Sequence, residues 1–326
     1  MKHYAAILTA IVFWGASYMV TALAYETTAP LQLGFVRAAL AALLFFLYRA
    51  LSGVREKLQR RDMPLCALSG LFGVTLYFAL QNVGLALTSS TTAVLIVASY
   101  PVIILVMESA VRRVRPSPHQ IVGILAAIAG IKILTGSSAD AGARPLLGNA
   151  LLIGTGIVWG LYGLPTQKIP RRYSTSTLTA WQMLFGALFF VPFVLFEGHP
   201  WVMPTMKSGL SIFFLAVCCS LLAFLCYNFA LKGISVTAAT SLLNLMPLVG
   251  LVCAWTALHE SIKVSQLFGG AVIVVGVLVS TAVPRRQSEG GKVKSAERER
   301  EEPFSLRAFI FCGIYRRSMS APETMR

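Results

Sequence analysis

MPLCALSGLFGVTLYFALQNVGLALTSSTTAVLIVASYPVIILVM, from Met63 to Met107, contains no charged residue. It is too long for one membrane-spanning helix, which needs about 20 apolar residues. The polar run at 88–92 interrupts it, so we interpret it as two spans joined by a tight turn. The whole chain of 326 residues is 56% hydrophobic and only 13% charged, with a mean hydropathy of +0.71. A soluble domain needs a larger polar share, so a polytopic membrane protein is predicted.

The apolar runs indicate helices rather than barrel strands. Within lipid, every backbone polar group must be bonded inside the protein, which leaves only helices or a closed barrel. Barrel strands alternate apolar and polar residues over about ten positions, whereas these runs are uniformly apolar over about 20. We expect an all-α membrane protein with ten transmembrane helices. Their expected ranges are 4–24, 30–51, 63–86, 89–111, 119–136, 147–165, 175–196, 208–230, 234–258 and 264–283.

The second half of the chain repeats the first. The matched residues are Trp14-Gly15 with Trp159-Gly160 at an offset of 145, and Asn82 with Asn228, Pro101 with Pro247, Gly123 with Gly269 and Gly130 with Gly276 at an offset of 146. Repeats of apolar helices are typical of transporters whose halves pack around a shared site. We expect two five-helix repeats at 1–136 and 147–283, followed by a charged, disordered tail at 284–326.

Basic residues fall unevenly on the two sides of the expected membrane. With a cytoplasmic N-terminus, thirteen Lys and Arg among the first 283 residues lie inside, four lie outside, and Arg37 lies within a span. Short loops rich in Lys and Arg stay in the cytoplasm. Both termini are therefore expected in the cytoplasm, and the protein in the cell inner membrane. The formal net charge of +15 is explained by this asymmetry and indicates no nucleic-acid partner.

Matching loops of the two halves carry different charges. The loop Arg112-Arg113-Val114-Arg115 corresponds to Leu258-His259-Glu260-Ser261. Three arginines inside are thus replaced outside by a histidine and a glutamate. Because each repeat has an odd number of helices, the second copy must enter the membrane upside down. The pattern predicts an inverted repeat about a pseudo-two-fold axis in the membrane plane.

The repeated motifs resemble a known transporter family. A Trp-Gly in the first helix of each half, an arginine in the second helix and a Thr/Ser turn before a proline-broken helix carry the resemblance. So does the run Pro247…His259-Glu260-Ser261…Gly269…Gly276. The chain resembles the drug/metabolite transporter superfamily, EamA type, with two EamA domains over 1–283. The resemblance implies alternating access, a cavity between the first four helices of each half, and peripheral fifth helices. Val114 departs from the acidic position that Glu260 fills.

Two prolines are candidate hinges. Pro101 and Pro247 lie near the middle of the fourth and ninth expected helices. A proline inside a helix removes one backbone hydrogen bond and bends the helix, and the freed carbonyl in a membrane needs another partner. A hinge or cavity role competes with a static kink that improves packing.

Aromatic residues form the second group of candidates. Trp14 and Tyr18 share one helix face, and Trp159 and Tyr162 occupy the matching helix. Trp14 lies ten residues into its span, so an interfacial belt does not explain it, and its indole N–H needs a partner. Lining of a polar cavity competes with packing against a neighbouring helix.

Buried amides complete the predicted substrate-binding set. Asn82 and Asn228 are repeat mates, and they either bond across helices or bind substrate. Asn244, three residues before a proline, adds a third amide. The remaining members of the set are Tyr100 and Tyr227.

Arg37 is the charge that the repeat does not duplicate. A charge within a span is costly and is a functional candidate by default. It could bind a substrate carboxylate or phosphate, snorkel to the outer interface or pair with Glu26. Its counterpart is Gln182 or Met183.

Other chemistry has little support in the sequence. Glu108 lies one helical turn from Arg112, which favours an ion pair over a proton relay. Five of the six cysteines lie in or beside apolar spans, and no metal spacing is present. No nucleotide-binding motif occurs. We expect no metal and no cofactor.

The leading interpretation is a secondary transporter that moves a small metabolite, such as an amino acid, by alternating access, in the direction of export. A monomer is favoured. The alternative is a non-transporting membrane sensor or scaffold. The four histidines are scattered over different loops, whereas a membrane enzyme needs a cluster of catalytic groups, so an enzyme is not expected.

Overall fold

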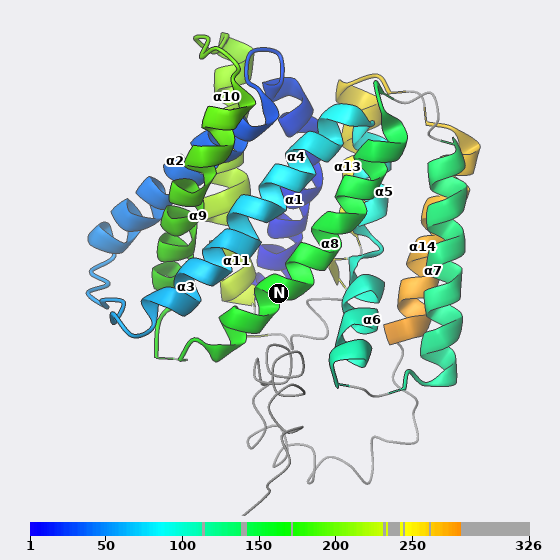
Figure 1. The fold of residues 1–326 in the computed structure, drawn as a ribbon, viewed down its shortest axis with the longest axis horizontal. Helices are drawn as coiled ribbons and strands as arrows, with labels where there is room; N and C mark the ends of the chain where they lie inside the picture. The colour runs from blue at the N-terminus through cyan, green and yellow to red at the C-terminus, as the bar shows by residue number, and fades with distance from the viewer. Residues whose placement is uncertain are drawn as a thin grey trace, which may run out of the picture.

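The computed structural model describes residues 1–112, 115–137, 142–170, 172–230, 233, 242–243, 245–260 and 262–281. Every regular element in this part is a helix, as Figure 1 shows. The helices are α1 (Lys2–Ala24), α2 (Pro30–Leu51), α3 (Met63–Gly70), α4 (Tyr77–Leu87), α5 (Ser90–Val97), α6 (Tyr100–Arg112), α7 (Pro118–Ser137), α8 (Pro145–Lys168), α9 (Thr175–Glu197), α10 (Met206–Phe214), α11 (Ala223–Ala230), α13 (Met246–Ala257) and α14 (Val264–Thr281). Two π-helical turns, η1 (Leu71–Leu76) and η2 (Leu215–Leu222), join α3 to α4 and α10 to α11.

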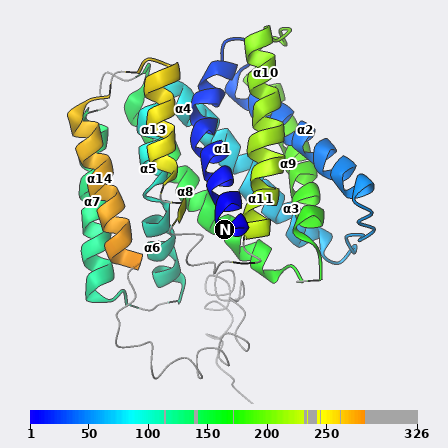
Figure 2. The same ribbon diagram turned by 180° about the vertical axis from the view of Figure 1, so that it is seen from behind.

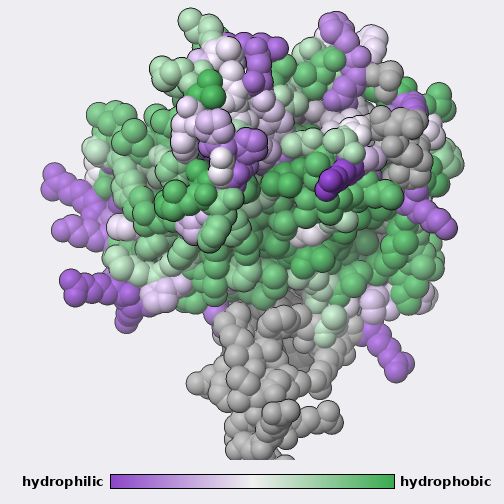
Figure 3. Space-filling model, turned by 45° about the horizontal axis from the view of Figure 1, so that its top comes forward, coloured by the Kyte–Doolittle hydropathy of each residue, from purple (hydrophilic) through white to green (hydrophobic). Residues whose placement is uncertain are grey.

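Length and composition make the chain a multi-pass membrane protein. Six helical stretches in the described residues are long and apolar enough to cross a membrane, and the bent pair α5 and α6 meets the same criterion as one span. Within α7, α13 and α14, shorter apolar stretches add to these. In the view of Figure 3, apolar residues form a broad band across the middle of this face, and hydrophilic residues gather above it and at its edges. The predicted all-helical membrane fold is confirmed.

The two candidate hinge prolines lie at the starts of helices. α5 ends at Val97, α6 begins at Tyr100, and the two are bent by about 40°. Pro101 is the second residue of α6, and Pro247 is the second residue of α13. At a helix start the missing N–H of proline costs no hydrogen bond. At Pro101 the expected kink inside one helix is therefore a break between α5 and α6, and Pro247 lies one residue after the start of α13.

The backbone hydrogen bonds beside both prolines match. In each half, two bonds join residues three apart, whereas a regular α-helix joins residues four apart. The matched bonds are Ser99 N to Ile96 O (2.9 Å) with Leu245 N to Leu242 O (3.0 Å), and Val102 N to Ser99 O (3.0 Å) with Leu248 N to Leu245 O (3.1 Å). The three positions of each half correspond at an offset of 146.

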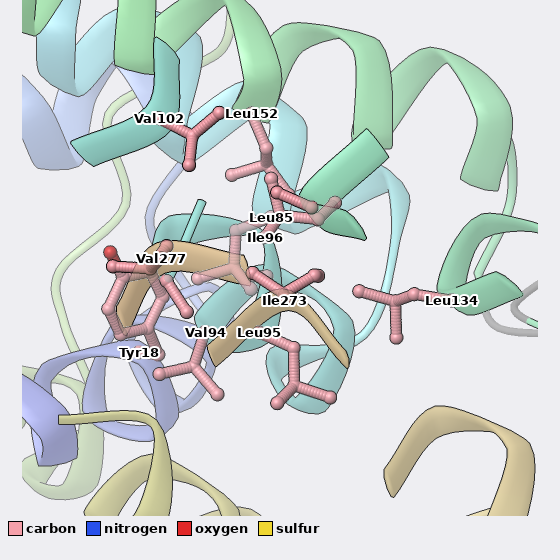
Figure 4. Packing of buried hydrophobic residues seen from close by; sticks show 13 residues of the cluster. Tyr18, Leu85, Val94, Leu95, Ile96, Val102, Leu134, Leu152, Ile273 and Val277 are labelled. Carbon is pink, nitrogen blue, oxygen red and sulfur yellow. The ribbon is translucent and has the colours of Figure 1, made fainter. Parts of the chain in front are cut away.

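Helices of one half pack chiefly on helices of the other, with matching partners. α1 packs on α11 and α13, while α8, at the matching place in the second half, packs on α4 and α6. One buried cluster joins α1, α4, α6 and α8 with α5 and α14, and Figure 4 shows Tyr18 in this cluster beside Val94. The halves are therefore interleaved rather than separate.

α7 and α14 form an antiparallel pair at one edge of the bundle, visible in Figure 2. Glycines bring their backbones together. A Cβ on Gly123 would lie 2.5 Å from the carbonyl oxygen of Gly276, and one on Gly130 would lie 2.7 Å from that of Gly269. These four glycines are the repeated ones of the sequence, and they pair crosswise: each contacts the repeat mate of the other glycine on its own side. The two fifth helices of the repeats thus lie at the periphery, as the family resemblance implies.

α2 and α9 are tied at both ends by carboxylates. Here the end of the bundle at which α1 finishes is called the outer end, and the opposite end the inner end. At the outer end, Glu197 accepts from the backbone N–H groups of Leu31 and Gln32, both at 3.0 Å. At the inner end, Glu56 accepts from the backbone N–H and hydroxyl of Ser174 at 2.7 and 2.8 Å. A carboxylate at a helix N-terminus is stabilised by the unbonded N–H groups and the helix dipole.

A third carboxylate joins the end of α13 to the start of α5. Glu260 follows α13 and accepts from the first N–H groups of α5, Ser90 at 3.1 Å and Thr91 at 3.0 Å. His259 before it has φ 53°, the one positive φ among the described residues other than glycine. This costly left-handed turn reverses the chain so that Glu260 reaches α5. Val114, its repeat mate, lies outside the described residues.

Asp62 organises the inner end near α3. It accepts from Tyr173 Oη at 2.6 Å and pairs with Arg172. The hydrogen bond from the Tyr173 hydroxyl is the main reason that the pKa of the Asp62 carboxyl lies below its usual value, and Arg172 lowers this pKa further. The ionised form is therefore favoured at neutral pH, and the contact links the α2–α3 and α8–α9 loops.

Candidate functional site

Arg37 of α2 is buried at the junction of the two halves. The residue is only 5% exposed. Nε donates to Ser220 Oγ of η2 at 3.1 Å, and Cζ lies 4.3 Å from the centre of the Phe78 ring. Glu26 forms an ion pair with Lys207 instead, at 3.5 Å. Pairing with Glu26 and snorkelling to the interface are therefore both wrong for Arg37.

The π-helical turn η2 supplies the polar atoms on the second-half side. In such a turn, bonds run from residue i to i−5 and the regular ladder is disturbed. Ser220 Oγ donates to the Leu215 carbonyl at 3.0 Å, and the Cys219 carbonyl accepts from the indole of Trp14 at 3.0 Å. Irregular backbone at membrane depth occurs where protein or a cavity covers it.

Trp14 therefore bonds to a neighbouring helix, which was the alternative to cavity lining. Its ring also contacts Phe224 and Tyr227, each with centroids 5.5 Å apart. Trp14 and Tyr227 are both partly exposed, so this aromatic group is not fully enclosed by the protein.

A second aromatic group lies between α4 and α8. Trp159 lies 5.2 Å from Tyr77 and 4.9 Å from Tyr162, measured between ring centroids. Tyr162 Oη donates to Gln182 Oε1 at 3.4 Å, and Gln182 Nε2 donates to Ser69 Oγ at 2.9 Å. The helices that meet here are the repeat mates of those around Trp14.

Tyr18 and Tyr100 are more deeply buried, at 3% and 6% exposed. Tyr18 lies in the central cluster, within electrostatic range of Arg37 and Tyr77. Tyr100 Oη donates to the Leu152 carbonyl at 3.2 Å. Tyr18 thus belongs to the surroundings of Arg37, whereas Tyr100 anchors α6 to α8.

Asn82 bonds across helices near the outer end. Its Nδ2 donates to the Pro30 carbonyl at 3.0 Å, and its backbone carbonyl accepts from Tyr25 Oη at 2.8 Å. The residue is 1% exposed, and its Oδ1 has no partner. These bonds fit the structural alternative for Asn82. Asn244 and the side chains of Asn228, Glu108 and Arg112 lie outside the described residues.

The structure thus brings Arg37, Tyr18 and the aromatic groups of Trp14 and Trp159 to the interface between the repeats. Sequence reasoning missed Ser220, Tyr77 and Phe78. The repeat carried a signal for one of them, because Phe224 follows Phe78 at the offset of 146. Nothing in the sequence marked Ser220, since its role depends on η2. Within the described residues, no group of three or more His, Cys, Asp or Glu could hold a metal ion.

A model of the EamA-like transporter family matches residues 1–136 and, a second time, residues 146–282. The chain belongs to the EamA-like transporter family. The resemblance seen in the repeated motifs is confirmed, and the family is one of membrane transporters rather than enzymes.

Relatives of this EamA protein align along nearly their whole length. An uncharacterized transporter of Archaeoglobus fulgidus is 25% identical over 86% of this chain and 98% of its own. The uncharacterized transporter YyaM of Bacillus subtilis is 26% identical over 91% and 100%. A probable terminal-alkyne amino-acid exporter of Streptantibioticus cattleyicolor is 26% identical over 84% and 91%. A crystal structure shares the fold, with a TM-score of 0.62 and 20% identity over 88% of this chain and 99% of that chain.

Trp14 offers a test of how much its hydrogen bond contributes to this EamA protein. Trp14→Phe keeps a ring but leaves the Cys219 carbonyl without its donor, so we expect a loss of about 1 kcal/mol in unfolding free energy and a modest loss of transport. Trp14→Ala also removes the ring and should reduce transport severely. Solute uptake per unit of membrane-inserted protein is the measurement. Collapse of expression in both variants would show that Trp14 serves packing alone.

Proposed function

We propose that this EamA protein is a secondary transporter that moves a small metabolite of the amino-acid class across the cytoplasmic membrane by alternating access, in the direction of export. The observation that carries the proposal is Arg37, a buried charge surrounded by aromatic side chains where the two repeats meet. Charges inside a membrane bundle mark substrate or ion pathways. The proposed binding set is Trp14, Tyr18, Arg37, Asn82, Tyr100, Trp159, Tyr162, Tyr227, Asn228 and Asn244.

The proposed architecture is ten transmembrane helices in two inverted five-helix repeats. Three observations support it: the crosswise glycine pairs of α7 and α14, the matching partners of α1 and α8, and the matched backbone bonds beside each proline. A two-fold axis would produce each of these. Pro101 and Pro247 are the proposed hinges, because each lies at the start of a helix, where the regular bonding pattern is interrupted.

The substrate class and the direction of transport are supported by a relative and by the chemistry around Arg37. The name of one relative, a probable amino-acid exporter, supports both. Aromatic rings beside one arginine suit a solute that has a charged group and an apolar part. A monomer in the inner membrane, with cytoplasmic termini and no cofactor, completes the proposal.

Transport is tested with purified protein in liposomes. We expect efflux or counterflow of one or more labelled amino acids to exceed that of empty liposomes. The control is Pro101→Ala with Pro247→Ala, which should keep binding and slow flux about tenfold, since the helical breaks would close. If a broad panel of amino acids and related metabolites shows no flux, the proposal is wrong.

The orientation makes a separate prediction. The basic loops at 55–61 and 168–172 are proposed to lie in the cytoplasm. Cysteines placed there should react with a membrane-impermeant thiol reagent in inverted vesicles but not in intact cells. A cysteine at Lys207, near the outer end of α10, is the control and should show the reverse. Labelling of either basic loop in intact cells would contradict the orientation.

A further inference from the structure

Arg37 presents only one edge of its guanidinium group to the protein. Nε is bound by Ser220, and the Ser220 hydroxyl is fixed by the Leu215 carbonyl. Within the described residues, neither Nη atom of Arg37 takes part in a hydrogen bond or an ion pair. Arg37 keeps 5% of its surface accessible. The two Nη atoms form a free fork.

Among the described side chains, the charge of Arg37 has no acidic counterpart. The carboxylates whose side chains are described are bound elsewhere: Glu26 to Lys207, Asp62 to Arg172, and Glu56, Glu197 and Glu260 to helix N-termini. The Phe78 ring stabilises the cation in part. A desolvated guanidinium still favours an anion strongly, and a ligand can supply it.

The repeat provides an internal comparison. Gln182 follows Arg37 at an offset of 145, and both residues are 5% exposed. The Gln182 amide is satisfied by Ser69 and Tyr162, whereas the Nη atoms of Arg37 have no such partners. The polar position of the second half is therefore closed by the protein itself, and that of the first half is open.

We propose that Arg37 binds the carboxylate of the transported solute end-on through both Nη atoms, with Ser220 as its positioning residue. The substrate class is then a small carboxylate, either anionic or zwitterionic, and decarboxylated amines are excluded. The two oxygens of a planar carboxylate match the spacing of the guanidinium fork. Because Ser220 occupies Nε, the Nη pair is the edge that remains. This inference rests on the proposed transport function and specifies its substrate.

Binding to the purified full chain tests the proposal with matched probes. One set is L-phenylalanine, phenylpropionate without the amine, and phenethylamine without the carboxylate. The other set is L-leucine, isocaproate and isoamylamine. The readout is thermal stabilisation as a function of probe concentration. We expect an amino acid or acid of at least one set to bind, and the matching amine to bind at least tenfold more weakly.

The variants separate binding from folding. Arg37→Gln, which copies the second-half residue, should weaken acid binding by about 30- to 100-fold, and Arg37→Lys should be intermediate, since a lysine cannot bind bidentately. Ser220→Ala should weaken acid binding by about three- to tenfold, and Ser220→Thr, which keeps the hydroxyl, should bind acids as tightly as the unmodified protein. Gln182→Leu is the matched control and should leave the acid-to-amine ratio unchanged. If Arg37→Gln does not fold, the Ser220 pair carries the test.

Each outcome decides between the two proposals. If amines bind as tightly as acids, or if Arg37→Gln folds and binds acids normally, the carboxylate inference is wrong while transport remains supported. If amino-acid flux occurs but Ser220→Thr binds acids no better than Ser220→Ala, the positioning role is wrong. If no probe binds up to about 10 mM and no amino acid is transported, both proposals fail.

Discussion

Glu260→Gln is expected to open the outer end of the bundle, raising the exposure of the α5–α13 contact about tenfold. The neutral amide loses the charge-assisted bonds to the Ser90 and Thr91 N–H groups and the favourable interaction with the helix dipole. A loss of about 1.4 kcal/mol would suffice for a tenfold change. Glu260 joins the end of α13 to the start of α5, so its release should let these two helices separate.

A buried cysteine reports this opening. Val94 of α5 is fully buried, and a Cβ on Gly250 of α13 would lie 2.5 Å from it. In Val94→Cys, the rate of labelling by an impermeant thiol reagent from outside measures separation of the two helices. Peptide mass spectrometry distinguishes this cysteine from the native ones.

Glu197→Gln is the matched control. Glu197 makes the same pair of bonds at the same end of the bundle, but to the start of the unbroken α2. Glu197→Gln should lower the unfolding free energy by about as much as Glu260→Gln does, and it should leave labelling at position 94 unchanged within about twofold. Equal labelling in the two variants would show that Glu260 is an ordinary helix cap and does not hold α13 against α5.

Gly123→Ala is expected to cost about 2–4 kcal/mol of stability. The new Cβ would lie 2.5 Å from the Gly276 carbonyl oxygen and 2.6 Å from the Ser280 backbone nitrogen. Both are backbone atoms, so no side chain can move aside and α7 must separate from α14. Unfolding in mixed detergent, followed by circular dichroism, measures the cost.

Gly154→Ala on α8 is the control for this substitution. There the nearest atom to a new Cβ is Leu80 Cδ1 at 3.8 Å, an ordinary contact. Helix propensity alone should make this change neutral or stabilising by up to about 1 kcal/mol. Equal effects at both glycines would rule out close backbone contact as the basis of the α7–α14 pair. A normal transport KM in Gly123→Ala, once folded, would agree with a peripheral role for that pair.

Much of the fold follows from local sequence. α2 occupies the expected 30–51, and the described ends of the other helices lie within a few residues of expectation. Apolar runs specify spans because lipid leaves the backbone no other hydrogen-bonding solution. The prolines indicated a bend, which at Pro101 is a break between α5 and α6. The repeated glycines marked the two halves, but their pairing across α7 and α14 appeared only in the structure.

The candidate site was less predictable. Arg37 was identified because a charge in an apolar span is conspicuous, but its three alternatives could not be separated. Trp14 was also identified without its partner, because the carbonyl that accepts from its indole belongs to η2. Glu260 was marked by a motif, but the motif did not reveal that this carboxylate caps α5. A π-helical turn has no clear residue signature, so neither Ser220 nor the Cys219 carbonyl could be foreseen.

The sequence by itself determined that this chain is a helical membrane protein of two similar halves, because hydropathy and repetition are properties of residues in order. Only the tertiary structure decided which polar groups are satisfied. Arg37 meets Ser220 across 183 residues, and Trp14 meets Cys219 across 205. Such partners depend on how the helices of the two halves interleave, and the free edge of Arg37 exists only because of that arrangement.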